Sequence, residues 1–232
     1  FGGGLFNYGE ASISTSAFQG NSTSVSGGGI YNDPAGNLTI STSTLSSNTA
    51  QYGGALINYG GTARLERSQL ERNHVEEAGG AINNSEGGSL VVSTSIIYAN
   101  EARFGGGVIN SANIMISNTS IVNNTATDYG GGLLNAEGGD ISLSFSTVWQ
   151  NESAHFGAGF DNSGVATVKN SIIGNSLAGN DCDNTPFLGE FTSKGGNFDT
   201  DGTCPEFVRA TREALGVREL AENGEPAGTL EL

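Results

Sequence analysis

Short runs in which apolar and polar residues alternate recur along most of the chain. In Leu38-Thr39-Ile40-Ser41 every second residue is apolar, and this two-residue period is that of a β-strand. Gly-rich and Asn-containing segments separate the runs. The pattern predicts a repeating unit of about three short strands, joined by Gly and Asn corners.

Two signatures mark each repeat. The first, Gly-Gly-(Gly/Ala)-apolar-x-Asn, ends at Asn7, Asn32, Asn58, Asn84, Asn110, Asn135 and Asn162, at intervals of 25 to 27 residues. The second, small-x-apolar-x-x-Asn, ends at Asn21, Asn48, Asn73, Asn100, Asn124, Asn151 and Asn175, its last copy being one residue short. A fixed period of this length is typical of solenoids. We predict repeats over residues 1–176 and a C-terminal cap segment over 177–232.

Aligned repeats place apolar residues in columns. One column is Leu5, Ile30, Leu56, Ile82, Val108, Leu133 and Phe160, and two more pass through Ile13 and Phe18. One such coil cannot bury its own apolar face, but coils stacked at the strand spacing of about 4.8 Å bury it against each other. The fold class is therefore predicted to be all-β, a parallel β-helix of about seven coils.

The two Asn columns are interpreted as structural. Asn tolerates the left-handed backbone that corners need, and stacked amides can hydrogen-bond along the helix axis. Both columns are therefore predicted to form ladders. Glycan attachment at Asn21 or Asn37 is the less favoured alternative, since ladder side chains point inward.

Composition excludes several classes of protein. The 37 glycines and 24 asparagines among 232 residues disfavour a helical bundle. The 24 acidic and 9 basic residues give a net charge of −15, which repels phosphate backbones and anionic lipids. No apolar run approaches the roughly 20 residues of a membrane helix. We therefore expect no nucleic-acid partner and no membrane span.

The paired signatures resemble those of a known family. Gly-Gly-Ala-Leu at 53–56, Gly-Gly-Ala-Ile at 79–82 and Phe-Gln-Gly-Asn at 18–21 are similar to the repeats of polymorphic outer-membrane proteins. The resemblance covers residues 1–176. It implies a right-handed β-helix in an exported bacterial protein, located extracellularly or at the cell surface, with a structural or adhesive role. It offers no catalytic residues to carry over to this sequence.

The C-terminal part carries a second resemblance. Residues 195–204 and 220–224 resemble the end module of secreted β-helix proteins with varied surface anchors, although Glu225 stands where a second glycine is usual. In an exported protein, Cys182 and Cys204 are expected to form a disulfide. Residues 205–216 read as one short helix that helps to cover the last coil.

Two further predictions concern ligands and partners. Asp199-Thr200-Asp201-Gly202 resembles the start of a calcium loop, so Asp199 and Asp201 are weak calcium candidates; a solvated loop is the default interpretation, and no other cofactor is expected. The first coil is expected to lack a cover, so upstream chain or a second copy would dock there. The self-association candidates are Phe1, Leu5, Thr229, Leu230 and Leu232, and end-to-end assembly into fibres is the resulting hypothesis.

Catalysis is the alternative function, as a polysaccharide lyase or hydrolase on a β-helix. Arg64, Arg67 and Arg72 are interleaved with acids, which predicts a solvated, salt-bridged surface and disfavours a lyase site. A hydrolase needs two carboxylates about 5–9 Å apart, yet Asp128, Asp140 and Asp161 occupy different repeat positions. We therefore predict a non-enzymatic module. Converging acids and bases in one groove would distinguish the enzyme.

The residue before each glycine run is aromatic in five of seven repeats: Phe1, Ser26, Tyr52, Ala78, Phe104, Tyr129 and Phe156. Corner packing is the favoured interpretation of this stripe. Stacking on a surface glycan or on another subunit is the functional alternative.

Overall fold

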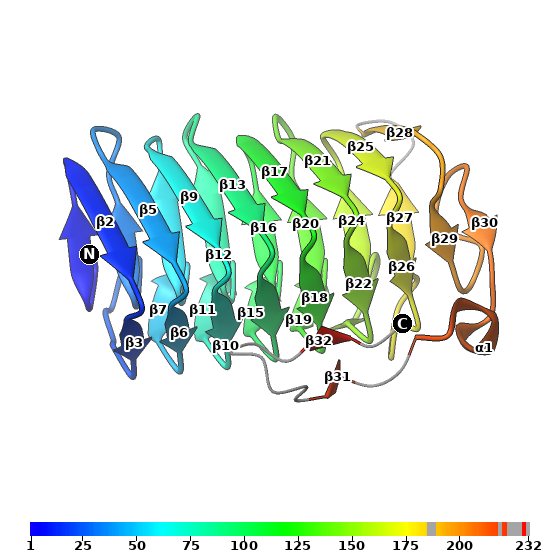
Figure 1. Ribbon diagram of the computed structural model, residues 1–232, viewed down its shortest axis with the longest axis horizontal. Helices are drawn as coiled ribbons and strands as arrows, with labels where there is room; N and C mark the ends of the chain where they lie inside the picture. The colour runs from blue at the N-terminus through cyan, green and yellow to red at the C-terminus, as the bar shows by residue number, and fades with distance from the viewer. Residues whose placement is uncertain (185–188, 218–219, 222–228, 231–232) are drawn as a thin grey trace.

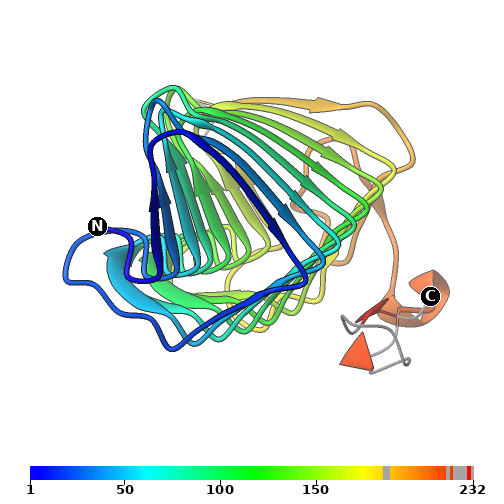
Figure 2. The ribbon, with the colours of Figure 1, turned by 60° about the vertical axis from the view of Figure 1, so that its left-hand side comes forward.

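The computed structural model describes residues 1–184, 189–217, 220–221 and 229–230. Its strands stack into long parallel sheets, which confirms the predicted parallel β-helix (Figure 1). In Figure 2 the coils are roughly triangular in cross-section, and the chain turns clockwise as it recedes from its N-terminal end. The helix is therefore right-handed, as parallel crossover connections nearly always are.

Sheets A, B and C form the three sides. Sheet A contains β1 (Leu5–Asn7), β4 (Ile30–Asn32), β8 (Leu56–Tyr59), β12 (Ile82–Ser85), β16 (Val108–Asn110), β20 (Leu133–Asn135), β24 (Phe160–Asn162) and β27 (Cys182–Asn184). Sheet B contains β2 (Glu10–Ser14), β5 (Asn37–Ser41), β9 (Thr62–Glu66), β13 (Ser89–Ser93), β17 (Asn113–Ser117), β21 (Asp140–Ser144), β25 (Val165–Lys169) and β28 (Glu190–Ser193). Sheet C contains β3 (Ala17–Gln19), β6 (Thr44–Ser46), β10 (Gln69–Glu71), β14 (Ile96–Tyr98), β18 (Ser120–Val122), β22 (Thr147–Trp149), β26 (Ile172–Gly174), β29 (Phe198–Asp199) and β30 (Val208–Arg209).

A fourth, shorter sheet was not expected from the sequence. Sheet D contains β7 (Thr49–Tyr52), β11 (His74–Ala78), β15 (Glu101–Phe104), β19 (Thr125–Tyr129) and β23 (Glu152–Ser153). Its inward residues Ala50, Val75 and Ala102 form a small buried cluster. Small side chains there leave little apolar signal, which explains why three strands per repeat were predicted.

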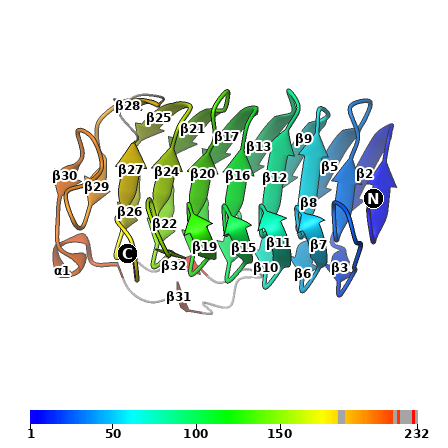
Figure 3. The same cartoon turned by 180° about the vertical axis from the view of Figure 1, so that it is seen from behind.

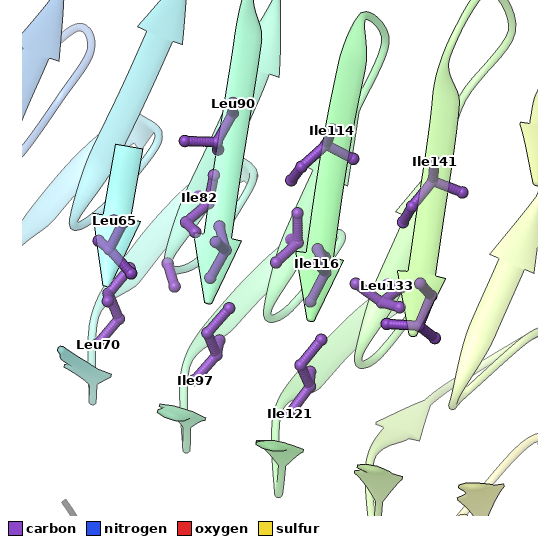
Figure 4. Close-up of a cluster of buried hydrophobic side chains, with 14 of the residues drawn as sticks. Leu65, Leu70, Ile82, Leu90, Ile97, Ile114, Ile116, Ile121, Leu133 and Ile141 are labelled. Carbon is purple, nitrogen blue, oxygen red and sulfur yellow. The ribbon is translucent and has the colours of Figure 1, made fainter. Parts of the chain in front are cut away.

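The core consists of the predicted apolar columns. Figure 4 shows Leu65, Leu70, Ile82 and their neighbours pointing toward one another from three sheets. Side chains of these columns in the inner coils are fully buried, whereas Leu5, Ile13 and Phe18 of the first coil are partly buried. Stacking therefore creates the core, as expected for a solenoid.

Left-handed backbone occurs beside the ladder asparagines rather than at them. The residue just before the second Asn column has positive φ in Ser47, Arg72 and Ala99, but Asn48, Asn73 and Asn100 do not. The predicted left-handed role of the ladder asparagines is therefore wrong for these positions. Their side-chain amides explain their recurrence instead.

The parallel stack continues beyond residue 176. Strands β27, β28 and β29 add to sheets A, B and C, so part of the segment predicted as a cap forms a further coil. The expected disulfide joins Cys182 in β27 to Cys204. Phe191 of β28 and Phe207 pack against the core at this end, edge to face, with their ring centroids 5.8 Å apart.

The predicted helix over 205–216 is mostly wrong. Only α1 (Arg212–Leu215) is helical, between an N-cap at Thr211 and a left-handed C-cap at Gly216. Val208 instead lies in β30, which pairs in parallel with β29. The short strands β31 (Leu220–Ala221) and β32 (Thr229–Leu230) pair antiparallel. Within the described residues, no helix has the length and apolar character needed to cross a membrane.

Candidate functional site

The first Asn column forms a continuous amide ladder at the corner between sheets A and B. Each Nδ2 donates to the Oδ1 of the asparagine in the next coil, at 2.7 or 2.8 Å, from Asn7 to Asn162. Asn162 extends the ladder to Asn184 in β27. These side chains satisfy one another and nearby carbonyls, so they hold the corner and are not exposed to a ligand.

The second Asn column is a ladder through six members. Asn21, Asn48, Asn73, Asn100, Asn124 and Asn151 are linked by Nδ2-to-Oδ1 hydrogen bonds of 2.9 to 3.0 Å. Asn175 lies outside the ladder: it takes the left-handed position that precedes the ladder residue, and its backbone N–H donates to Thr200 Oγ1. The missing residue in the seventh signature accounts for this shift.

A hydroxyl column was missed from the sequence. The residue that opens the second signature is Ser or Thr, and its hydroxyl accepts a hydrogen bond from the backbone N–H of the matching residue in the preceding coil. The backbone N–H of Ser16 donates to Ser43 Oγ, and that of Ser43 donates to Ser68 Oγ. The same hydroxyl donates to the carbonyl two residues earlier. The recurring Ser or Thr at this position is the signal in the sequence. The second signature, defined there by a small residue, does not distinguish a hydroxyl from other small side chains.

The calcium candidates carry structural hydrogen bonds. Asp201 Oδ1 accepts from the backbone and hydroxyl of Thr203, and its Oδ2 accepts from the backbone N–H of Asp181. Asp199 is fully buried, and its Oδ2 accepts from the backbone of Cys204. The described residues contain no group of three or more His, Cys, Asp or Glu side chains suited to a metal ion. Calcium binding therefore stays a prediction.

The arginine cluster is an exposed ion-pair surface. Arg64 and Arg67 both contact Glu66, at 3.1 and 2.6 Å, and Arg72 contacts Glu71 at 3.1 Å. These contacts draw the guanidinium groups to neighbouring acids of the same coil, and the hydrogen bond from Arg64 lowers the pKa of the Glu66 carboxyl.

The self-association candidates lie in separate places. Leu5 packs against the core in the first coil, while the exposed ring of Phe1 lies 4.9 Å from that of Tyr31 on the outside of sheet A. Thr229 and Leu230 form β32, whereas Leu232 lies outside the described residues. End-to-end assembly stays a prediction.

Two depressions lie in line on the outer face of sheet A, beside sheet D, and we call the pair the sheet A groove. Its floor is the second residue of each sheet A strand from β4 to β27, and these residues pair in register from coil to coil: Tyr31, Ile57, Asn83, Ile109, Leu134, Asp161 and Asp183. Figure 3 shows the two sheets side by side along the molecule. The groove comprises two depressions of about 630 and 350 Å³.

The N-terminal depression is aromatic, and we call it the aromatic end. It is lined by Phe1, Tyr31, Tyr52 and Tyr59, with Ile57 and Ile109 in its floor. Tyr31 stacks between Phe6 and Tyr59, at centroid distances of 5.1 and 6.0 Å. Rings of Phe1 and Tyr59 remain exposed, so the predicted corner packing leaves ring surface open to solvent.

The C-terminal depression combines rings with carboxylates, and we call it the acidic end. Phe104, Tyr129 and Phe156 stack along its wall at 6.0 and 6.2 Å. Asp161 and Asp183 are paired positions of β24 and β27, and both line the depression. Burial, with the charge of Asp183 second, raises the pKa of Asp161 to about 7.

Sequence reasoning missed this acid pair. Asp161 falls in the floor position of the seventh repeat, but Asp183 lies beyond residue 176, where the repeat was predicted to end. The Cys182-Asp183-Asn184 triplet matches the apolar-x-Asn end of the first signature and was the signal that could have revealed it.

No known protein family, curated protein or solved structure matches the chain.

Proposed function

We propose that this chain is a non-enzymatic adhesive module of an exported protein, and that its sheet A groove binds an extended glycan. The observation that carries the proposal is the line of exposed rings along a groove parallel to the β-helix axis. An apolar patch that a soluble protein leaves exposed marks an interaction site. Aromatic side chains suit such a site because they offer large apolar faces with little conformational entropy to lose.

Charge restricts the class of glycan. The chain has a net charge of −15, and no Lys or Arg lines either depression among the described residues. An acidic polysaccharide would be repelled. The proposed ligand is therefore a neutral or amine-bearing glycan.

The disulfide supports an exported location. Cys182 and Cys204 are bonded, and stable disulfides are typical of extracellular proteins. Together with the repeat resemblance, this pairing favours a location outside the cell or at its surface.

Binding to a panel of labelled oligosaccharides tests the function. Replacing Tyr31 and Tyr59 together by alanine removes two rings from the aromatic end, and binding should weaken at least tenfold. Phe145→Ala is the matched control, because Phe145 is exposed but lies outside the groove lining. Equal loss in both variants, or no binding by the wild type to any neutral or amine-bearing glycan, would contradict the proposal.

A polysaccharide hydrolase is the second candidate function. The observation that favours it is the acid pair Asp161–Asp183 in the groove, since glycoside hydrolysis uses two carboxylates, one of them kept protonated by a raised pKa. Release of new reducing ends from a bound glycan, lost in Asp161→Asn, would replace the adhesive proposal by this one.

End-to-end assembly is part of the adhesive proposal. It predicts fibres in electron micrographs of the purified chain and a mass well above one subunit by light scattering. Uniform particles with the 23.7 kDa mass of one chain would remove assembly and leave glycan binding to be tested alone.

A further inference from the structure

The acidic end holds a buried carboxylate, Asp161. Asp161 is only 6% exposed, yet its side chain has no hydrogen bond or ion pair within the described part of the chain, and it lines the depression. Buried carboxylates are normally paired with a cation or with several donors. The nearest matched floor position is another acid, Asp183, which makes the local deficit of positive charge larger.

Asp128, an acid beside this wall, has charged and polar partners. Asp128 accepts a hydrogen bond of 2.7 Å from Arg103 Nε and lies 3.6 Å from His155 Nδ1. Arg103 in turn lies over the ring of Phe104, 4.8 Å from its centroid. Arg103, Asp128 and His155 do not line the acidic end, so the described lining holds no basic side chain beside Asp161 and Asp183.

The lining has the chemistry that recognises organic cations. Phe104, Tyr129 and Phe156 supply stacked rings, and ring faces attract ammonium groups through their quadrupoles. The two carboxylates supply the countercharge. A hard metal ion would need six or more oxygen ligands, whereas most of this lining is carbon.

We propose that the acidic end of the sheet A groove binds an organic ammonium group. The group would be either the amine of a glucosamine unit in a glycan or the quaternary ammonium of a choline-type compound. The site does not depend on glycan binding elsewhere in the groove, so it goes beyond the adhesive function. Binding of such a cation also favours ionised Asp161, whose raised pKa otherwise keeps a proton on it near neutral pH.

Titrations followed by NMR chemical shifts, at pH 6.5 and moderate ionic strength, test the proposal with three probes: glucosamine hexamer, N-acetylglucosamine hexamer and choline chloride. The amine hexamer should bind at least tenfold more tightly than the acetylated one, or choline should shift resonances of β24 and β27. Either effect should disappear in the double variant Asp161→Asn with Asp183→Asn.

A charge-matched control separates the site from general attraction to an acidic protein. Glu137→Gln with Asp140→Asn removes the same two charges from exposed positions outside the acidic end, and this variant should bind like the wild type. Equal weakening in both double variants would overturn the proposal, as would failure of the amine hexamer and choline to bind the wild type.

The three probes also separate the ammonium site from glycan adhesion. Equal binding of both hexamers, lost on removal of Tyr31 and Tyr59, together with no choline shift in β24 and β27, would leave the adhesive function standing and refute the ammonium site. Choline binding that depends on Asp161 and Asp183, with no binding of either hexamer, would support the ammonium site while refuting glycan adhesion.

Discussion

The ladder asparagines act as structural residues because each one satisfies several buried groups at once. Asn73 Oδ1 accepts from the backbone N–H and the Nδ2 of Asn48, and its Nδ2 donates to the Leu45 carbonyl and to Asn100 Oδ1. Asn73→Ala removes all four hydrogen bonds in the core. Because each unsatisfied buried group costs about 1–3 kcal/mol, the free energy of unfolding should fall by about 3 kcal/mol or more in guanidinium titrations.

An exposed asparagine provides the comparison. Asn113 opens β17 with its side chain in solvent, so Asn113→Ala should change the free energy of unfolding by no more than about 0.5 kcal/mol. Similar effects of the two substitutions would mean that the amide ladder contributes little beyond filling space.

Asp161 gives a pH dependence whose sign follows from its raised pKa. The pKa of Asp161 is near 4 in the unfolded chain and about 7 in the folded protein. Between these two pH values the folded protein keeps a proton that the unfolded chain loses, so the free energy of unfolding falls as the pH rises. Asp161→Asn, which is neutral at every pH, should therefore be more stable than the wild type at pH 8, by roughly 2–4 kcal/mol. The two should be equally stable near pH 4.

Unfolding curves of both proteins at pH 4 and pH 8 measure this difference. Asp140→Asn is the control, because Asp140 is exposed at the start of β21; its effect should be small at both pH values. A constant difference between Asp161→Asn and the wild type across this range would contradict the burial of an unpaired carboxyl.

At the scale of the element, the glycine runs permit the close approach of successive coils, because a side chain would not fit there. A Cβ on Gly106 would lie 2.6 Å from the carbonyl oxygen of Gly131 in the next coil, closer than real contacts allow. Gly106→Ala should therefore separate sheet A strands locally and lower the free energy of unfolding by about 3 kcal/mol. Gly9→Ala, where a Cβ meets nothing within 4 Å, should be close to neutral. Circular dichroism melts of both variants check this ordering.

The strands were predictable because their signal repeats. The columns through Ile30, Ile40 and Leu45 contain apolar residues in all seven predicted repeats, so errors in one repeat are corrected by the others. Parallel pairing then follows from the equal spacing, as in Ile30 with Leu56. The disulfide was predictable since only two cysteines exist.

Features that occur once, or that depend on which way a side chain faces, were not predictable. The residues after Pro205 have a helical pattern, but the sequence does not show that the edge of β29 lies beside them. Val208 pairs with that edge as part of β30, so tertiary pairing outweighs local propensity. Similarly, Asp183 acquires a meaning only beside Asp161, and that proximity requires the last coil to continue sheet A. The groove itself depends on which residues of each strand face outward.

Across the whole molecule, stability is a sum of coil-to-coil contacts, so damage should remain local. The disulfide joins β27, in the last coil of sheet A, to Cys204 in the segment between β29 and β30, and it spans 22 residues.

Closing a loop of this size by a disulfide stabilises the folded protein by about 3 kcal/mol. Replacing both cysteines by alanine should therefore raise amide hydrogen exchange roughly a hundredfold in β27 to β30. Amides of β12 and β16, which lie four and three strands away from β27 in sheet A, should change far less, because sheet A passes the perturbation only through successive neighbours. Uniformly faster exchange along all coils would instead show that the β-helix unfolds as one cooperative unit.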